Sequence, residues 1–107
     1  MKLPKQLTKR LTPHHPLPAG IFTYHTPPDA PVPYRLHLRI EKDGSGVLIV
    51  NATTVLHLNQ TAAEYAYHLI SQTSDQKVAE LVSKRYQVSP QQVLQDYQQF
   101  RERIREL

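Results

Sequence analysis

The chain has 107 residues and a formal net charge of +4, which corresponds to the size of one ordinary domain. It contains no cysteine, so disulfides, cysteine–zinc sites and iron–sulfur clusters are excluded. The sequence has no apolar run of about 18 residues that would predict a membrane helix, and its N-terminus lacks the apolar segment of a secretory signal. We therefore expect a cytoplasmic protein with no membrane partner.

Proline divides the chain into two parts. Eight of the nine prolines lie within residues 4–33, and the remaining one is Pro90. Proline clusters favour extended, poorly packed segments. The sequence therefore predicts a proline-rich, basic N-terminal arm over residues 1–33, followed by a compact domain over residues 34–107.

The domain opens with three predicted strands. Residues 34–41 alternate apolar and polar side chains, which is typical of a strand with one wet face. A turn containing Gly44 and Gly46 leads to residues 47–50, which are apolar on both faces and read as the central strand. Residues 54–58 form the third strand. Because the connections are short, we expect an antiparallel sheet in the order first, second, third.

Three predicted helices follow, where the apolar period changes from two to about 3.6 residues. The first spans about residues 59–72, with Asn59 or Thr61 as its cap, and the second spans about residues 75–86. The third begins at Pro90 after Ser89, a natural N-cap, and continues to the C-terminus. The expected fold is therefore α+β, a three-stranded antiparallel sheet followed by three helices.

The third strand, Thr54–Leu58, is expected to leave one edge of the sheet open. It is apolar on both faces and has no lysine, proline or glycine to discourage pairing with another chain. An edge of this kind is either a docking site for a further strand or is covered by the proline-rich arm. Both interpretations remain open from the sequence.

The strands and helices resemble, in number, order and spacing, the PqqD-like family of RiPP recognition elements. The residues that carry the resemblance are Val47–Val50, the run Leu56-His57-Leu58-Asn59-Gln60-Thr61-Ala62-Ala63 entering a helix, and Asp96–Phe100 in the third helix. The resemblance covers residues 34–107. It implies a winged-helix-like fold that binds the leader of a ribosomally synthesised precursor peptide and presents it to a radical SAM maturase, a class that includes the spliceases.

The resemblance also implies a site, in which the leader adds as a strand beside the third strand and the third helix. Mapped onto this chain, the peptide-binding residues are Thr54, Val55, Leu56, His57, Leu58, Tyr97, Phe100, Arg101, Ile104 and Arg105. Tyr97 and Phe100 would be apolar anchors, although core packing explains them equally well. Arg101 and Arg105 would reach leader carboxylates, although a solvated, charged helix end is the better explanation for at least one of the arginines at this end of the helix.

The arm carries a further apolar segment with Ile21, Phe22 and Tyr24. Such residues among prolines can dock on a partner enzyme, here the radical SAM protein, or on the domain's own sheet. The sequence favours neither interpretation.

No pattern of catalytic residues is present. The chain has no cysteine nucleophile, no glycine-rich phosphate loop and no G-x-S-x-G turn, and its six histidines show no helical H-x-x-x-H pair. We therefore expect a non-catalytic accessory subunit without cofactor or metal.

The alternative function is winged-helix DNA binding. Residues 1–60 hold seven Lys/Arg against three acidic residues, and several glutamines of the third helix are suited to reading adenine. However, residues 61–107 hold six basic and six acidic residues, so the helical half has no net charge to hold phosphates. Nucleic acid is therefore the less favoured partner.

Overall fold

The computed structural model describes residues 17–107 and contains an antiparallel sheet followed by three helices. The strands are β1 (Gly20–His25), β2 (Arg35–Ile40), β3 (Gly46–Val50) and β4 (Thr54–Leu58). The helices are α1 (Gln60–Ser71), α2 (Asp75–Tyr86) and α3 (Pro90–Arg105). The α+β class is therefore confirmed, and the six elements predicted after residue 33 all form within one or two residues of their expected bounds.

The prediction of three strands is wrong, because the sheet has four strands in the order β1-β2-β3-β4. The additional strand, β1, comes from the segment predicted as a proline-rich arm, and it pairs antiparallel with β2 from Gly20↔Ile40 to His25↔Arg35. Its residues alternate between half-buried and exposed, as a strand requires, but the flanking prolines hid that alternation. Residues 1–16 of the predicted arm lie outside the described residues.

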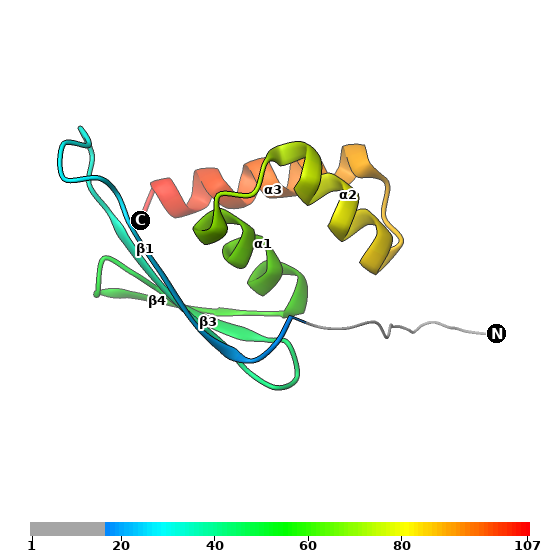
Figure 1. The fold of residues 1–107 in the computed structure, drawn as a ribbon, viewed down its shortest axis with the longest axis horizontal. Helices are drawn as coiled ribbons and strands as arrows, with labels where there is room; N and C mark the ends of the chain where they lie inside the picture. Colours follow the sequence, from blue (N-terminus) through cyan, green and yellow to red (C-terminus); the bar gives the residue numbers. More distant parts are fainter. Residues whose placement is uncertain (1–16) are drawn as a thin grey trace.

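The molecule has two layers, with all three helices on one side of the sheet (Figure 1). Alternate residues of β2 are fully buried against the helices or exposed on the opposite face, which follows from the period of two in a strand. The apolar cluster between the layers contains the following buried residues: Leu36, Leu38, Ile40, Leu48, Val50, Ala66 and Ile104. Phe22 and Tyr24 of β1 pack against this cluster as partly buried residues.

Two turns with left-handed backbone connect the central strands. Gly44, between β2 and β3, has φ +89°, a conformation that residues with a side chain rarely adopt. Between β3 and β4, Asn51 and Ala52 have φ 55° and 64°. The Asn51 side-chain oxygen accepts a hydrogen bond from the Arg35 backbone N–H at 2.9 Å, which holds this turn against β2.

Each helix begins at a capping side chain. Asn59, Ser74 and Ser89 accept hydrogen bonds from the backbone N–H groups of Ala62, Lys77 and Gln92. Asn59 and Ser89 were predicted as caps. A second apolar cluster joins the three helices through the following buried residues: Tyr65, Val78, Ala79, Val82, Val93 and Tyr97.

The position of Phe22 shows that β1 contributes to the core. Its ring meets the Tyr67 ring of α1 edge to face, with the ring centroids 5.1 Å apart. We expect Phe22→Ala to lower the free energy of unfolding by about 2 kcal/mol, below the value for a fully buried phenylalanine because the side chain is half-buried. Urea unfolding of both proteins measures this change.

The matched control for this prediction is Ile21→Thr, since Ile21 is 63 % exposed on the other face of the same strand. Its replacement keeps a β-branched side chain and should change stability by less than about 0.5 kcal/mol. Equal effects of the two substitutions would contradict a core role for β1.

Candidate functional site

The candidate site is the outer edge of β4. One side of β4 pairs with β3 through Gly46↔Leu58, Leu48↔Leu56 and Val50↔Thr54. Within residues 17–107, no strand pairs with its other side, since β4 ends the sheet. The described part of the predicted arm lies at the opposite edge, on β2, and so does not cover β4.

The backbone groups that face this edge follow from the alternation of hydrogen bonds along an antiparallel ladder. The Asn51 N–H donates to the Arg35 carbonyl, and the Glu41 N–H donates to the Ser45 carbonyl. Odd-numbered residues of β3 are therefore bonded to β2, and its even-numbered residues are bonded to β4. By the same alternation, the N–H and C=O groups of Val55 and His57 point away from β3, toward the open edge.

The side chains of β4 divide between the two faces of the sheet. Thr54, Leu56 and Leu58 are half-buried on the helix side, and Leu56 and Leu58 pack against the sheet cluster. Val55, 53 % exposed, and His57, also exposed, lie on the opposite face. An added strand would therefore meet apolar side chains on its helix side.

Of the predicted anchors on α3, Tyr97 and Ile104 are buried, at 2 % and 6 % exposed. Tyr97 belongs to the cluster between the helices, where its ring lies 5.5 Å from that of Tyr65, and burial raises its pKa. Burial also raises the pKa of Tyr65 to about 12. Ile104 belongs to the sheet cluster. Tyr97 and Ile104 therefore build the core beneath any surface site.

The two predicted arginines differ in how they are held. Both terminal guanidinium nitrogens of Arg101, Nη1 and Nη2, donate to the Asp75 carboxylate at 3.0 Å, and the group lies over the Tyr97 ring, 4.6 Å from its centroid. Arg101 thus joins α3 to the start of α2. Arg105 is exposed and lies near Tyr34. Burial raises the pKa of Tyr34, and the positive charge of Arg105 partly offsets that rise.

Phe100 is the predicted α3 anchor with remaining exposure. It is half-buried and packs against both apolar clusters, including that of Leu56 and Leu58. Ile104 and Phe100 of α3 and Leu56 and Leu58 of β4 thus belong to, or pack against, the same sheet cluster. The structure places Tyr97 and Arg101 at the contact with α2 instead.

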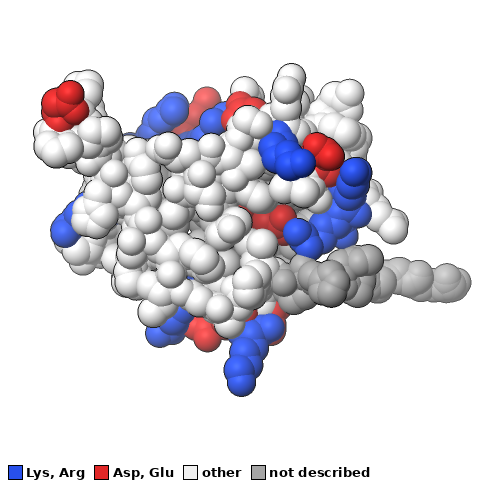
Figure 2. Space-filling view, viewed as in Figure 1, with Lys and Arg blue, Asp and Glu red and all other residues white. Residues whose placement is uncertain are grey.

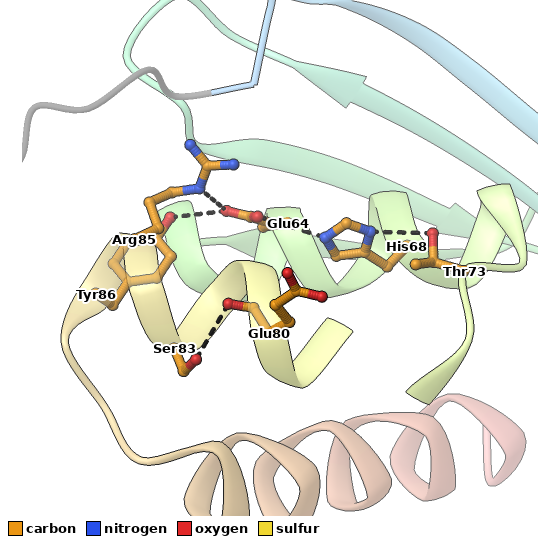
Figure 3. A network of polar contacts seen from close by, with 7 residues as sticks. All are labelled: Glu64, His68, Thr73, Glu80, Ser83, Arg85 and Tyr86. Atoms are coloured by element: carbon orange, nitrogen blue, oxygen red, sulfur yellow. Dashed lines mark hydrogen bonds and ion pairs between the residues drawn. The ribbon is translucent and has the colours of Figure 1, made fainter. Parts of the chain in front are cut away.

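A buried polar network, which the sequence analysis missed, joins α1 to α2 (Figure 3). Glu64, 2 % exposed, has one carboxylate oxygen 2.8 Å from the Arg85 Nε, and the same oxygen accepts a hydrogen bond from the Tyr86 hydroxyl at 3.2 Å. Its other oxygen lies 3.4 Å from the His68 Nε2, and the His68 Nδ1 lies 3.1 Å from the Thr73 hydroxyl. The network fixes the C-terminal end of α2 against α1.

Glu64 is held in its ionised form. Burial alone raises its pKa, but the hydrogen bond from His68 and the positive charge of Arg85 outweigh burial, so the pKa lies below its ordinary value. Burial and the Glu64 charge raise the pKa of Tyr86, which therefore stays a hydrogen-bond donor. Because an ionised carboxylate only accepts hydrogen bonds, His68 donates from Nε2.

The sequence held one signal for this network. Glu64 and His68 stand four residues apart on the predicted first helix, a spacing that places them on one face. The spacing within one helix could not show that Arg85 and Tyr86 would reach Glu64 from α2.

Within residues 17–107, no group of three or more His, Asp or Glu side chains is placed to hold a metal ion. None of the helices in that part of the chain combines the length and apolar character needed to cross a bilayer.

Comparisons with known proteins found no matching family model, no matching curated protein and no matching solved structure.

Removing the Glu64 charge tests the network. We expect Glu64→Gln to lower the free energy of unfolding at neutral pH by about 2–4 kcal/mol, because Arg85 would keep a largely buried charge without its carboxylate. Glu80→Gln is the matched control, since Glu80 forms only exposed ion pairs with Lys77 and Lys84 and should cost less than about 1 kcal/mol. Similar effects of both substitutions, measured by urea unfolding, would contradict the network's role.

The pH dependence of stability gives a second test. The native pKa of Glu64 lies below its ordinary value of 4.5, so below pH 4.5 the unfolded chain binds a proton at this group before the native protein does. The stabilisation is thus complete above pH 4.5 and is lost as the pH falls through the native pKa. We expect the unfolding free energy of the wild type to fall more steeply with acidification in this window than that of Glu64→Gln.

Other acids contribute equally to both proteins, so the difference between the two pH profiles isolates Glu64. Asp43 is one of them, since hydrogen bonds from Ser45 lower its pKa. Parallel profiles for wild type and variant would show that Glu64 has an ordinary pKa in the native protein.

Proposed function

We propose that this chain binds the leader segment of a ribosomally synthesised precursor peptide by β-strand addition and presents it to a radical SAM maturase. The observation that carries the proposal is the outer edge of β4, where Val55 and His57 direct their backbone groups away from β3. The resemblance of residues 34–107 to PqqD-like proteins supplies the identity of the strand and of the enzyme. Within this proposal, residues 34–107 form the winged-helix-like module, and β1 extends its far edge.

The leader would lie along β4 as a fifth strand. Residues opposite Val55 and His57 would exchange backbone hydrogen bonds with them, each contributing about 0.5–1.5 kcal/mol. Leader side chains on the helix side would face Leu56, Leu58 and the exposed part of Phe100, which favours apolar residues at alternate positions.

Electrostatic selection of the leader would fall mainly to Arg105. It is exposed, whereas Arg101 already holds Asp75 through two hydrogen bonds. A leader carboxylate near the C-terminal end of α3 would therefore pair with Arg105 at the rim of the site, where such pairs add modest affinity and fix the register.

The protein's own contribution would be binding without chemistry. By holding the leader, it would raise the effective concentration of the core peptide at the maturase, which shares the cytoplasm with the precursor. Of the three apolar residues predicted to contact the enzyme from the arm, Ile21 is 63 % exposed, while Phe22 and Tyr24 pack against the core. Contact with the maturase through this segment would therefore depend on Ile21.

Winged-helix DNA binding has less support. On the side of the molecule drawn in Figure 2, Lys and Arg lie intermixed with Asp and Glu around a broad uncharged area. Phosphate backbones require positive charge concentrated along the contact. A duplex oligonucleotide is nevertheless the appropriate competitor in the binding test.

A proline at position 57 tests the proposed edge. His57→Pro removes an N–H that points outward, and edge strands tolerate proline where the N–H faces solvent. We expect it to weaken leader binding by about tenfold or more while the fold persists. The probes are labelled synthetic peptides whose sequences are encoded by short reading frames beside the gene. Fluorescence anisotropy measures their binding, and circular dichroism checks the fold.

Two further variants make this experiment specific. His57→Ala removes the side chain but keeps the N–H, so binding should stay within about threefold of wild type. Leu56→Pro is unsuitable, because by the same alternation the Leu56 N–H points toward β3 and its loss would damage the sheet itself. Unchanged affinity in a folded His57→Pro protein, or binding only to the duplex, would overturn the proposal.

A further inference from the structure

The sheet face opposite the helices has a composition that leader binding does not explain. In the sheet register, one row across this face reads Ile21, Arg39, Val47, His57, and the next reads Thr23, His37, Ile49, Val55. Arg35 and His25 form a third pair. None of the four strands carries an acidic residue, so the charge that the strands place on this face is positive.

The centre of this face is apolar. Ile49 lies directly opposite Val55, and Val47 stands two residues from Ile49 on the same side of β3. Val47 and Ile49 are half-buried and Val55 is 53 % exposed. A solvent-facing side of an antiparallel sheet normally carries polar residues, and adjoining exposed apolar residues mark an interaction surface.

Beside the apolar centre lies an open hollow of about 350 Å³. Its lining combines cationic and polar groups with an apolar wall and includes Thr23, His25, Arg35, His37, Ile49 and Ala52. Among residues 17–107, no carboxylate forms an ion pair with Arg35, whereas Arg39 meets Glu41 at 2.7 Å in an exposed pair. The hollow therefore suits a carboxylate that stands next to an apolar side chain.

We propose that this face binds an acidic amphipathic helix of a partner protein. Apolar side chains of the helix cover Val47, Ile49 and Val55, and carboxylates reach Arg35 in the hollow and Arg39 at the other end of β2. The two arginines are four strand residues apart, about 13 Å, which matches two turns of a helix, about 11 Å. A helix here completes a three-layer arrangement with the sheet in the middle.

Charge disfavours two other occupants. Residues 1–16 contain four Lys/Arg and no acidic residue, so they have the same sign as this face. A second copy of the chain stacked face to face would place two positively charged faces against each other. Nucleic acid would satisfy the arginines but leave the apolar centre without a partner.

The proposal does not rest on leader binding, because it uses side chains of β2, of β3 and of Val55 rather than the outward backbone groups of β4. Its test uses the full chain and a synthetic peptide of about 15 residues, with leucines at helical spacing flanked by glutamates. A second peptide with glutamine in place of glutamate reports the charge contribution. Isothermal titration measures affinity, and amide chemical shifts locate the contact.

We expect the double variant Arg35→Glu/Arg39→Glu to weaken binding of the acidic peptide by about tenfold or more. The matched control Lys84→Glu/Arg103→Glu makes the same change in net charge at exposed positions on α2 and α3 and should bind as wild type does. Because charge reversal can disturb folding, Ile49→Thr is a second variant that weakens the apolar contact and keeps both arginines. His57→Pro, which tests leader binding, should leave this affinity within about threefold of wild type.

Four outcomes would overturn the proposal. These are equal weakening by the control pair, absence of binding to the wild type, tighter binding of single-stranded RNA that the same arginine variants abolish, and a dimer in light scattering that Ile49→Thr disrupts. If the wild type bound the acidic helix but not the leader peptides, the proposed function would be contradicted and this surface would not.

Discussion

The alternation of backbone hydrogen bonds along the antiparallel ladder determines two features of the sheet. It sets which side chains face away from the helices and which backbone groups point outward at the β4 edge. Odd-numbered residues of β2 and β3 bond to each other, and the same residues turn their side chains away from the helices. In β4 the odd-numbered residues Val55 and His57 direct their backbone groups outward, and their side chains lie on the helix-free face. Residues directly opposite Leu56 and Leu58 on an added strand would occupy the closer, non-hydrogen-bonded type of pair. Apolar contact on the helix side and backbone bonding at the edge would therefore reinforce each other.

The sequence predicted the elements whose periodicity is strong and undisturbed. β2 alternates without exception, and Asn59 and Ser89 mark helix starts with side chains that do accept the expected hydrogen bonds. β1 was missed because the surrounding prolines were interpreted as a signal for the whole segment, and because the adjacent apolar residues Ile21 and Phe22 interrupt its alternation. Local composition agrees with the loop over residues 26–34 but did not describe the strand before it.

The candidate site was predictable only where it depends on strand order. The open edge of β4 followed from the sequence, since the third predicted strand has no later strand to pair with. The roles of the α3 residues did not follow, because they depend on which helix face meets α2. Tyr97 and Arg101 lie one turn apart and meet α2 and its N-terminal Asp75, whereas Phe100 and Ile104 meet the sheet cluster. The helix period gives the width of the apolar stripe on α3, but it does not show which of its residues meet α2 and which meet the sheet.

Charged contacts hold α2 at both of its ends and thereby position α3 beside the sheet. At the start of α2, Asp75 receives two hydrogen bonds from Arg101 of α3, and at its end Arg85 and Tyr86 meet Glu64 of α1. Between these contacts, Val78 and Val82 are buried in apolar packing, which is not directional. Short, directional polar contacts at two separated points fix the orientation of α2. The buried Glu64 network fixes the end of α2 and, through α2, contributes to the position of α3, the helix that carries Phe100 and Arg105.

The two proposed surfaces adjoin along β4, and this has an energetic consequence. A fifth strand added to β4 would enlarge the helix-free face beside Val55, which a helix on that face would also cover. If both ligands bind, each therefore changes the surface available to the other, and the coupling free energy is the same in both directions. A leader that extends the apolar centre would tighten helix binding, whereas one that places carboxylates on this face would repel the carboxylates of the helix. The outward-facing residues of the bound strand would thus decide whether leader and partner helix are held together or exclude each other.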